Sequence, residues 1–230
     1  MNIPLNKVLT VPPLMNGDRL TRDEFERRYH KMPPGTRAEL IEGEVFMPSP
    51  ARWVSHGGPH QDIGTWLGTY RAHTLGTDAG ADATIRLDLD NEPQPDAALI
   101  VLPSHGGRVA LDQEDYVTGS PELVAEVSAS TVSIDLHRKL KAYQRNGVGE
   151  YIVWRTEDEE IDWFVFRETR FERLSPDADG SFRSTLFPGL WLDAPALVRR
   201  DLATVLATLN RGLASPEHAA FVARLAAAKK

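Results

Sequence analysis

Two acidic residues stand where the sequence otherwise predicts buried strands. Glu126 interrupts the apolar run Leu123–Val127, and Asp96 follows Pro95 at the start of the apolar run 97–102. A carboxylate buried without a partner costs several kcal/mol or becomes protonated. Glu126 therefore needs solvent at a strand end, an arginine partner or a metal ion. A Pro-Asp dipeptide by itself is also common in turns.

The alternation of side chains along a strand relates the two acids. It places Asp96 on the face of Ala98 and Ile100, and Glu126 on the face of Val124 and Ser128. If the two strands are neighbours, both carboxylates can meet at one point. Two carboxylate ligands completed by water suit Mg²⁺ or Mn²⁺.

Lys139 is the basic residue that could serve these acids. It stands four residues after Asp135 and four before Tyr143, so a surface ion pair on a helix is one interpretation. Helical side chains lean towards the N-terminus, however, and this helix begins just after the strand of Glu126. In that position Lys139 would orient the attacking water or stabilise charge on a phosphate.

Other polar residues are weaker candidates. His60 opens a predicted helix, where it would contact a phosphate or a water beside the metal, or would only cap the helix. Of Glu39, Glu42 and Glu44, one is a candidate to complete the acidic cluster.

A locally basic tract is a candidate for phosphate binding. It comprises His137, Arg138, Lys139, Lys141 and Arg145, and Arg138 and Lys141 are its candidate phosphate contacts. The alternative is a solvated helix face.

Composition limits the chemistry and the partners. The 230 residues include no cysteine, which excludes disulfides, thiolate metal sites and a cysteine nucleophile. The 26 basic and 33 acidic residues give a net charge of −7, so binding to nucleic acid requires a local basic surface. We expect no membrane span and no secretory signal, and therefore a cytoplasmic protein.

The first half of the chain predicts a helix, a hairpin and a sheet-forming region. Residues 1–17 suggest an extended arm, and Thr21 would cap a short helix within 18–32. Two short strands around Glu42-Gly43 form the predicted hairpin. An amphipathic helix over 58–75 and strands over 83–90 and 97–102 follow, before a polar excursion at 106–120.

The second half predicts the remaining core and a helical end. A strand over 122–128 precedes a helix over 131–145, with Thr131 or Ser133 as its cap. Strands over 151–154 and 161–166 form a second hairpin, and helices fill 198–228 with a break at Ser215-Pro216. We therefore divide the chain into an arm (1–17), one domain (18–197) and a C-terminal helical extension (198–230).

The order of these motifs resembles a known family. ELIEGE is followed by the helix of His60, Pro95-Asp96, LVAEVSAST, DLHRKLKAYQRNGVGEYIVW and FPGLW. This order resembles the Uma-two family of restriction-endonuclease-like proteins, a branch of the PD-(D/E)XK nuclease superfamily, over roughly residues 20–200. The most specific part contains Asp135, Lys139, Tyr143, Gly147, Glu150 and Tyr151.

The resemblance implies a fold and a set of roles. The fold would be α/β, with a restriction-endonuclease-like core whose mixed central sheet is flanked by helices, an N-terminal β-hairpin and added C-terminal helices. Asp96 and Glu126 match the metal-binding acids, and the carbonyl of Val127 matches the backbone ligand. Ser128 stands where the superfamily has lysine, and Lys139 takes over that role. His60, Glu39, Asp135 and Tyr143 match further polar positions of the family.

The implied activity is Mg²⁺- or Mn²⁺-dependent hydrolysis of nucleic-acid phosphodiester bonds, with DNA as the favoured substrate and a homodimer as one way to bind it. Fold analogy alone does not establish an activity. A second hypothesis is a catalytically silent binding protein that associates through the helices beyond Val198. A third is a hydrolase of small phosphate esters, for which the chain has no phosphate-binding glycine loop.

Overall fold

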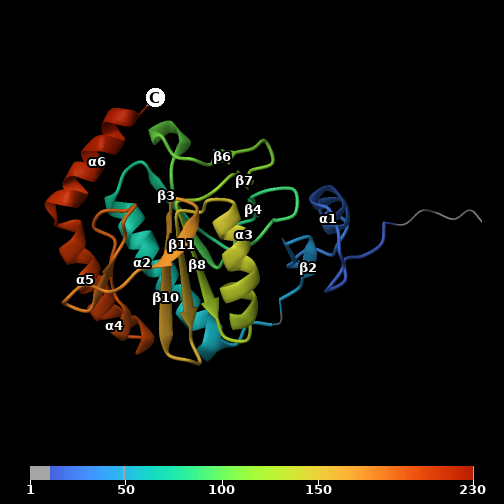
Figure 1. Cartoon of the computed structure of the whole chain (residues 1–230), viewed down its shortest axis with the longest axis horizontal. Helices are drawn as coiled ribbons and strands as arrows, with labels where there is room; N and C mark the ends of the chain where they lie inside the picture. The colour runs from blue at the N-terminus through green and yellow to red at the C-terminus, as the bar shows by residue number, and fades with distance from the viewer. Residues whose placement is uncertain (1–10, 49, 230) are drawn as a thin grey trace, which may run out of the picture.

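Six strands form the central sheet, in the order β11-β10-β9-β8-β5-β3 (Figure 1). The computed structural model describes residues 11–48 and 50–229. Strands β8 and β9 are parallel and the other neighbours are antiparallel, so the sheet is mixed as expected. The strands are β3 (Thr77–Ala81), β5 (Ala97–Val101), β8 (Leu123–Ser128), β9 (Glu150–Arg155), β10 (Glu160–Arg167) and β11 (Arg170–Arg173).

One face of the sheet carries α2 (Gly58–His73) and the C-terminal helices α4 (Ala194–Val198), α5 (Leu202–Leu213) and α6 (Pro216–Ala228). This main core joins alternate residues of β5 and β8 to the apolar residues of α2, and Val205, Leu209 and Phe221 extend it into the C-terminal helices. The division at residue 198 therefore does not separate two cores. Side chains of Asp193, Asp201 and Ser215 cap these helices.

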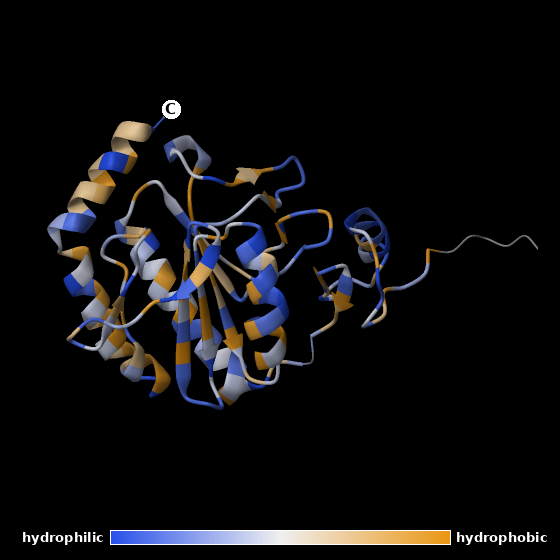
Figure 2. Ribbon diagram, viewed as in Figure 1, coloured by the Kyte–Doolittle hydropathy of each residue, from blue (hydrophilic) through white to orange (hydrophobic). Residues whose placement is uncertain are grey.

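The opposite face carries one continuous helical segment, η3 (Ile134–Lys139) followed by α3 (Leu140–Arg145). Its Tyr143 packs with Ala98 and Val124 of the sheet in a second core. The helix expected over 131–145 is confirmed, although its first part is π-helical. Neither Thr131 nor Ser133 makes a capping bond with its side chain, because Thr131 Oγ1 donates to the Asp135 carboxylate instead. Figure 2 shows long hydrophobic stretches along the central strands between these two layers.

The N-terminal hairpin lies beside the sheet and has a small core of its own. It consists of β1 (Glu39–Ile41) and β2 (Glu44–Phe46), and it packs with α1 (Arg22–Tyr29) around Phe25, Leu40 and Val45. Glu42 and Gly43 both have positive φ, 53° and 71°, as a two-residue hairpin turn requires. The hairpin prediction is confirmed. Thr21 precedes α1 without a side-chain capping bond. Residues 1–10 of the expected arm lie outside the described residues, and 11–17 contain no helix or strand.

The strand assignment differs from the sequence prediction in several places. Residues 77–81 form the edge strand β3, although TDAGA shows no strand pattern, because pairing with β5 supplies its hydrogen bonds. The strand expected over 83–90 shortens to β4 (Ile85–Arg86), which lies in a small separate sheet with β6 (Ala110–Leu111) and β7 (Val117–Thr118). The remaining elements are η1 (Trp53–Gly57), η2 (Pro103–His105), β12 (Ser181–Arg183) and β13 (Trp191–Asp193).

Among the described residues, no helix is long and apolar enough to cross a membrane.

Candidate active site

Asp96 and Glu126 face each other across the β5–β8 pair. The register joins Ala97 to Ala125, so these two acids occupy the next opposed positions. Both side chains lie on the sheet face covered by η3 and α3, and both residues are buried. Asp96 Oδ2 accepts a hydrogen bond of 2.6 Å from the backbone N–H of Val127. An antiparallel pair in this register therefore places the two acids at opposed positions on one face of the sheet.

Lys139 reaches this acidic centre from the helical segment. Its Nζ lies 2.9 Å from Glu126 Oε1, 2.8 Å from Glu39 Oε1 and 3.8 Å from Asp135 Oδ1. Tyr143 donates a 3.0 Å hydrogen bond to the same Oε1 of Glu126. Glu39 is thus the hairpin acid that joins the cluster. The ammonium of Lys139 is therefore buried among three carboxylates and does not form a surface ion pair.

Burial dominates the protonation of this cluster. Burial raises the pKa of Glu126 well above its usual value, against the attraction of Lys139, and the carboxylates of Asp135, Asp96 and Glu39 raise it further. Burial alone would lower the pKa of Lys139, but Glu126, Glu39 and Asp135 raise it well above its usual value. Lys139 is therefore protonated at neutral pH, and three carboxyl groups share its single charge.

Ser128 and Asp135 support the site from the end of β8. Asp135 Oδ2 accepts hydrogen bonds from Ser128 Oγ and from Thr131 Oγ1, at 2.5 and 2.6 Å. Tyr151 donates a 3.1 Å bond to the backbone carbonyl of Asp135. Ser128, which stands at the lysine position of the superfamily pattern, thus orients an acid that contacts Lys139.

His56 is a site residue that sequence reasoning missed. Its Nδ1 lies 2.9 Å from the carbonyl oxygen of Val127, and its Nε2 lies 3.3 Å from Asp96 Oδ1. The hydrogen bond with Asp96 raises the pKa of His56, although burial opposes it. The segment ARWVSHGG has no periodicity that predicts an element. The spacing of four residues between His56 and His60 was the available signal, and the two rings do stack, with centroids 5.8 Å apart.

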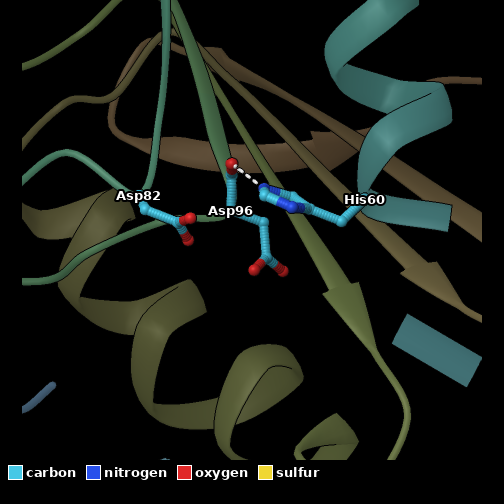
Figure 3. A group of neighbouring side chains, drawn as sticks. All are labelled: His60, Asp82 and Asp96. Carbon is cyan, nitrogen blue, oxygen red and sulfur yellow. Dashed lines mark hydrogen bonds between the residues drawn. The ribbon is translucent and has the colours of Figure 1, made fainter. Parts of the chain in front are cut away.

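His60 contacts the backbone of Asp96. It projects from α2, and its Nε2 lies 2.6 Å from the backbone oxygen of Asp96 (Figure 3). The ligand atoms of His60, Asp82 and Asp96 lie within 4.8 Å of one another, so these residues form a second donor set that shares Asp96. Asp82 is exposed and pairs with Arg37, whereas Glu126 is buried. Asp96 is therefore common to a buried pair with Glu126 and to a more exposed set with His60 and Asp82.

The basic tract at residues 137–145 mainly forms ion pairs with the N-terminal hairpin. Arg138 lies 2.8 Å from Glu44 and covers the ring of Phe46, while Arg145 pairs with Glu42 and with Asp88. Lys141 is exposed. In this structure, the guanidinium of Arg138 is thus occupied by a carboxylate.

A mixed sheet between helices, with paired acids on adjacent strands and a lysine above them, defines a protein of the restriction-endonuclease-like class. A solved structure supports this fold: the chain described as a putative nuclease belonging to DUF820 from Anabaena variabilis is similar with a TM-score of 0.53 and 13% identity. The match covers 75% of this chain and 97% of that chain.

The chain belongs to the Uma2 family, described as "Putative restriction endonuclease", which matches residues 22–195. No curated protein matches the chain. The resemblance read from the sequence and the expected fold class are confirmed.

Proposed function

We propose that this chain is a metal-dependent nuclease that hydrolyses phosphodiester bonds of nucleic acid, with DNA as the favoured substrate. One observation carries the proposal: the carboxylates of Glu126, Glu39 and Asp135 share the single ammonium of Lys139, and Asp96 stands opposite Glu126 in the sheet. A buried carboxylate without a balancing cation is costly or takes up a proton. A divalent cation would supply the balancing charge and keep these carboxylates ionised.

The donor set fits Mg²⁺ or Mn²⁺. Asp96, Glu126 and the carbonyl of Val127 are oxygen donors, which these ions prefer. Lys139 and Tyr143 both bind Oε1 of Glu126, and this leaves Oε2 for an ion. The Val127 carbonyl holds His56 in this structure, so the ring has to leave before the carbonyl can bind a metal. An ion held there would act as a Lewis acid on the phosphate.

Lys139 would act as a hydrogen-bond donor and not as a base. Its raised pKa keeps the ammonium protonated at neutral pH. Glu126 and Glu39 fix its Nζ at 2.9 and 2.8 Å, so the side chain needs little reorganisation when it binds a phosphate oxygen or the attacking water. Tyr143 donates to the same Oε1 of Glu126 and helps to hold that carboxylate in place.

The catalytically silent binding protein is the second candidate. It is favoured by the occupation of Arg138 and Arg145 by hairpin acids, which leaves little positive charge for a nucleic-acid backbone near the site. The domain division, a homodimer and a cytoplasmic location stay predictions.

The decisive experiment incubates the protein with supercoiled plasmid, linear DNA and RNA, in Mg²⁺, Mn²⁺ or EDTA. Asp96→Asn removes a charge from the site, and Asp90→Asn is the matched control at an exposed aspartate. We expect cutting that requires the metal, survives in Asp90→Asn and is lost in Asp96→Asn. Equal cutting by Asp96→Asn would refute the assigned site. Metal binding without any cutting would favour the silent protein.

A further inference from the structure

Trp53 is the most exposed large hydrophobic side chain of the described residues. It is 83% exposed, and Val54 beside it is 80% exposed. Trp66, Trp154 and Trp163 are buried in the main core. An indole left in water forgoes the burial that stabilises its counterparts. With Val54 it forms an exposed apolar pair, and contiguous exposed apolar surface can mark an interaction site.

The segment that carries Trp53 also contacts the candidate active site in this structure. Trp53 begins η1, and three residues later His56 contacts both Asp96 and Val127. The backbone oxygen of Arg52 accepts bonds from the N–H groups of His56 and Gly57, at 3.1 and 2.9 Å. These bonds make η1 a wide helical turn, a feature often found at functional sites.

A bond from the sheet side also holds this turn. Thr156 follows β9, and its Oγ1 donates a hydrogen bond of 2.8 Å to the backbone oxygen of Ser55. The indole is therefore presented to solvent from a supported turn that also carries His56, the neighbour of Asp96.

Arg52 gives the same surface a positive charge. It is exposed, and within the described part of the chain it forms no ion pair, unlike Arg138 and Arg145 beside the hairpin. An unpaired guanidinium next to an exposed indole matches the chemistry of single-stranded nucleic acid, in which a phosphate alternates with an unstacked base.

We propose that Trp53 stacks on an unpaired base of a strand bound at the candidate site, while Arg52 contacts a neighbouring phosphate. The occupant of this surface is a single strand, or a locally opened duplex, because bases inside an intact duplex are already stacked on their neighbours. This inference rests on the proposed nuclease function and narrows its substrate to nucleic acid with unpaired bases.

The test measures binding of a labelled single-stranded DNA 12-mer and of the matching duplex by anisotropy, with Ca²⁺ in place of Mg²⁺. We expect Trp53→Ala to weaken binding of the single strand on the order of tenfold and to change duplex binding little. Trp53→Phe keeps a stacking ring and should retain most of the affinity. Leu75→Ala is the matched control, because Leu75 is 79% exposed outside the η1 segment.

Two further measurements complete the test. Arg52→Gln should make the slope of log affinity against log salt concentration shallower, by the amount expected for about one phosphate contact. Sedimentation of wild type and Trp53→Ala should give the same oligomeric state, and a loss of self-association in the variant would assign the surface to a second copy and overturn the proposal.

The outcomes separate this inference from the function on which it rests. Equal single-strand affinity of Trp53→Ala and wild type, with metal-dependent cutting intact, overturns the stacking role alone. A wild type that binds no single strand but cuts duplex DNA also overturns it and leaves the nuclease standing. A wild type that neither binds nor cuts any nucleic acid refutes both.

Discussion

The Nζ of Lys139 lies 2.9 Å from Oε1 of Glu126, although one residue is on a helix and the other on a strand 13 residues earlier. Both side chains are only 5% exposed. The same Nζ also lies 2.8 Å from Glu39 of the hairpin. One buried charge therefore joins the N-terminal hairpin to the consecutive elements β8 and η3.

Removal of that charge should destabilise the fold. Lys139→Met leaves Glu126 and Glu39 without a cation, and loss of one partner of a buried ion pair costs about 3–5 kcal/mol. Urea unfolding in EDTA measures the change. Lys141→Met, at an exposed position of the same helical segment, should change the unfolding free energy by less than about 0.5 kcal/mol. If Lys139→Met were as stable as wild type, the carboxylates around it would have to be protonated.

Metal binding should appear as stabilisation that depends on Glu126. At Mg²⁺ or Mn²⁺ concentrations near 100 times Kd, the wild type should gain about 2.7 kcal/mol of unfolding free energy. Glu126→Gln keeps the shape of the side chain but removes the anionic ligand, so most of this gain should vanish. Thermal melts with metal and with EDTA give the comparison, and Glu157→Gln serves as the exposed control. If Glu126→Gln gained as much stability from the metal as the wild type, the ion would be assigned to the site of His60, Asp82 and Asp96 instead.

His56 should compete with the ion. Its ring holds the carbonyl of Val127 and lies 3.3 Å from an oxygen of Asp96, two of the three proposed ligands. His56→Ala should therefore lower the Mg²⁺ concentration for half-maximal stabilisation, severalfold, when titrated at one fixed pH. His73→Ala, at an exposed histidine of α2, should have no such effect. Weaker metal binding in His56→Ala would instead make His56 a support of the bound ion.

Glu92 predicts a pH dependence of stability that is separate from the metal-binding residues. Burial, together with a hydrogen bond to Glu26, raises the pKa of Glu92 from 4.5 to about 8. Between pH 4.5 and about 8, the folded state keeps a proton on Glu92 that the unfolded state has released. The stabilisation is therefore complete below about pH 4.5 and is lost as the pH rises towards 8.

Glu92→Gln mimics the protonated form and removes this titration. We expect the variant and the wild type to be similarly stable at pH 5, and the variant to be more stable at pH 8 by on the order of 2 kcal/mol. Urea unfolding at the two pH values measures this difference, with Glu157→Gln as the control. A difference that does not change with pH would mean that Glu92 is ionised throughout.

Local patterns in the sequence determined much of the fold and the two central acids. The alternation of side chains along a strand is a local property of the chain. It places Asp96 and Glu126 on defined faces of their strands, whichever strands pair. The turn at Glu42-Gly43 and the helical spacing around Lys139 are likewise local, and the structure has the hairpin and the helix.

Only the tertiary structure decided which polar residues meet at the site. Glu39, Glu42 and Glu44 belong to one short hairpin, and the docking of that hairpin brings Glu39 to Lys139 while Glu42 and Glu44 pair with Arg145 and Arg138. Strand β3 has no strand pattern and exists through its pairing with β5. His56 reaches Val127, 71 residues away, from a segment without periodicity. These contacts join elements distant in the chain, and their stability comes from burial and pairing that no local sequence pattern encodes.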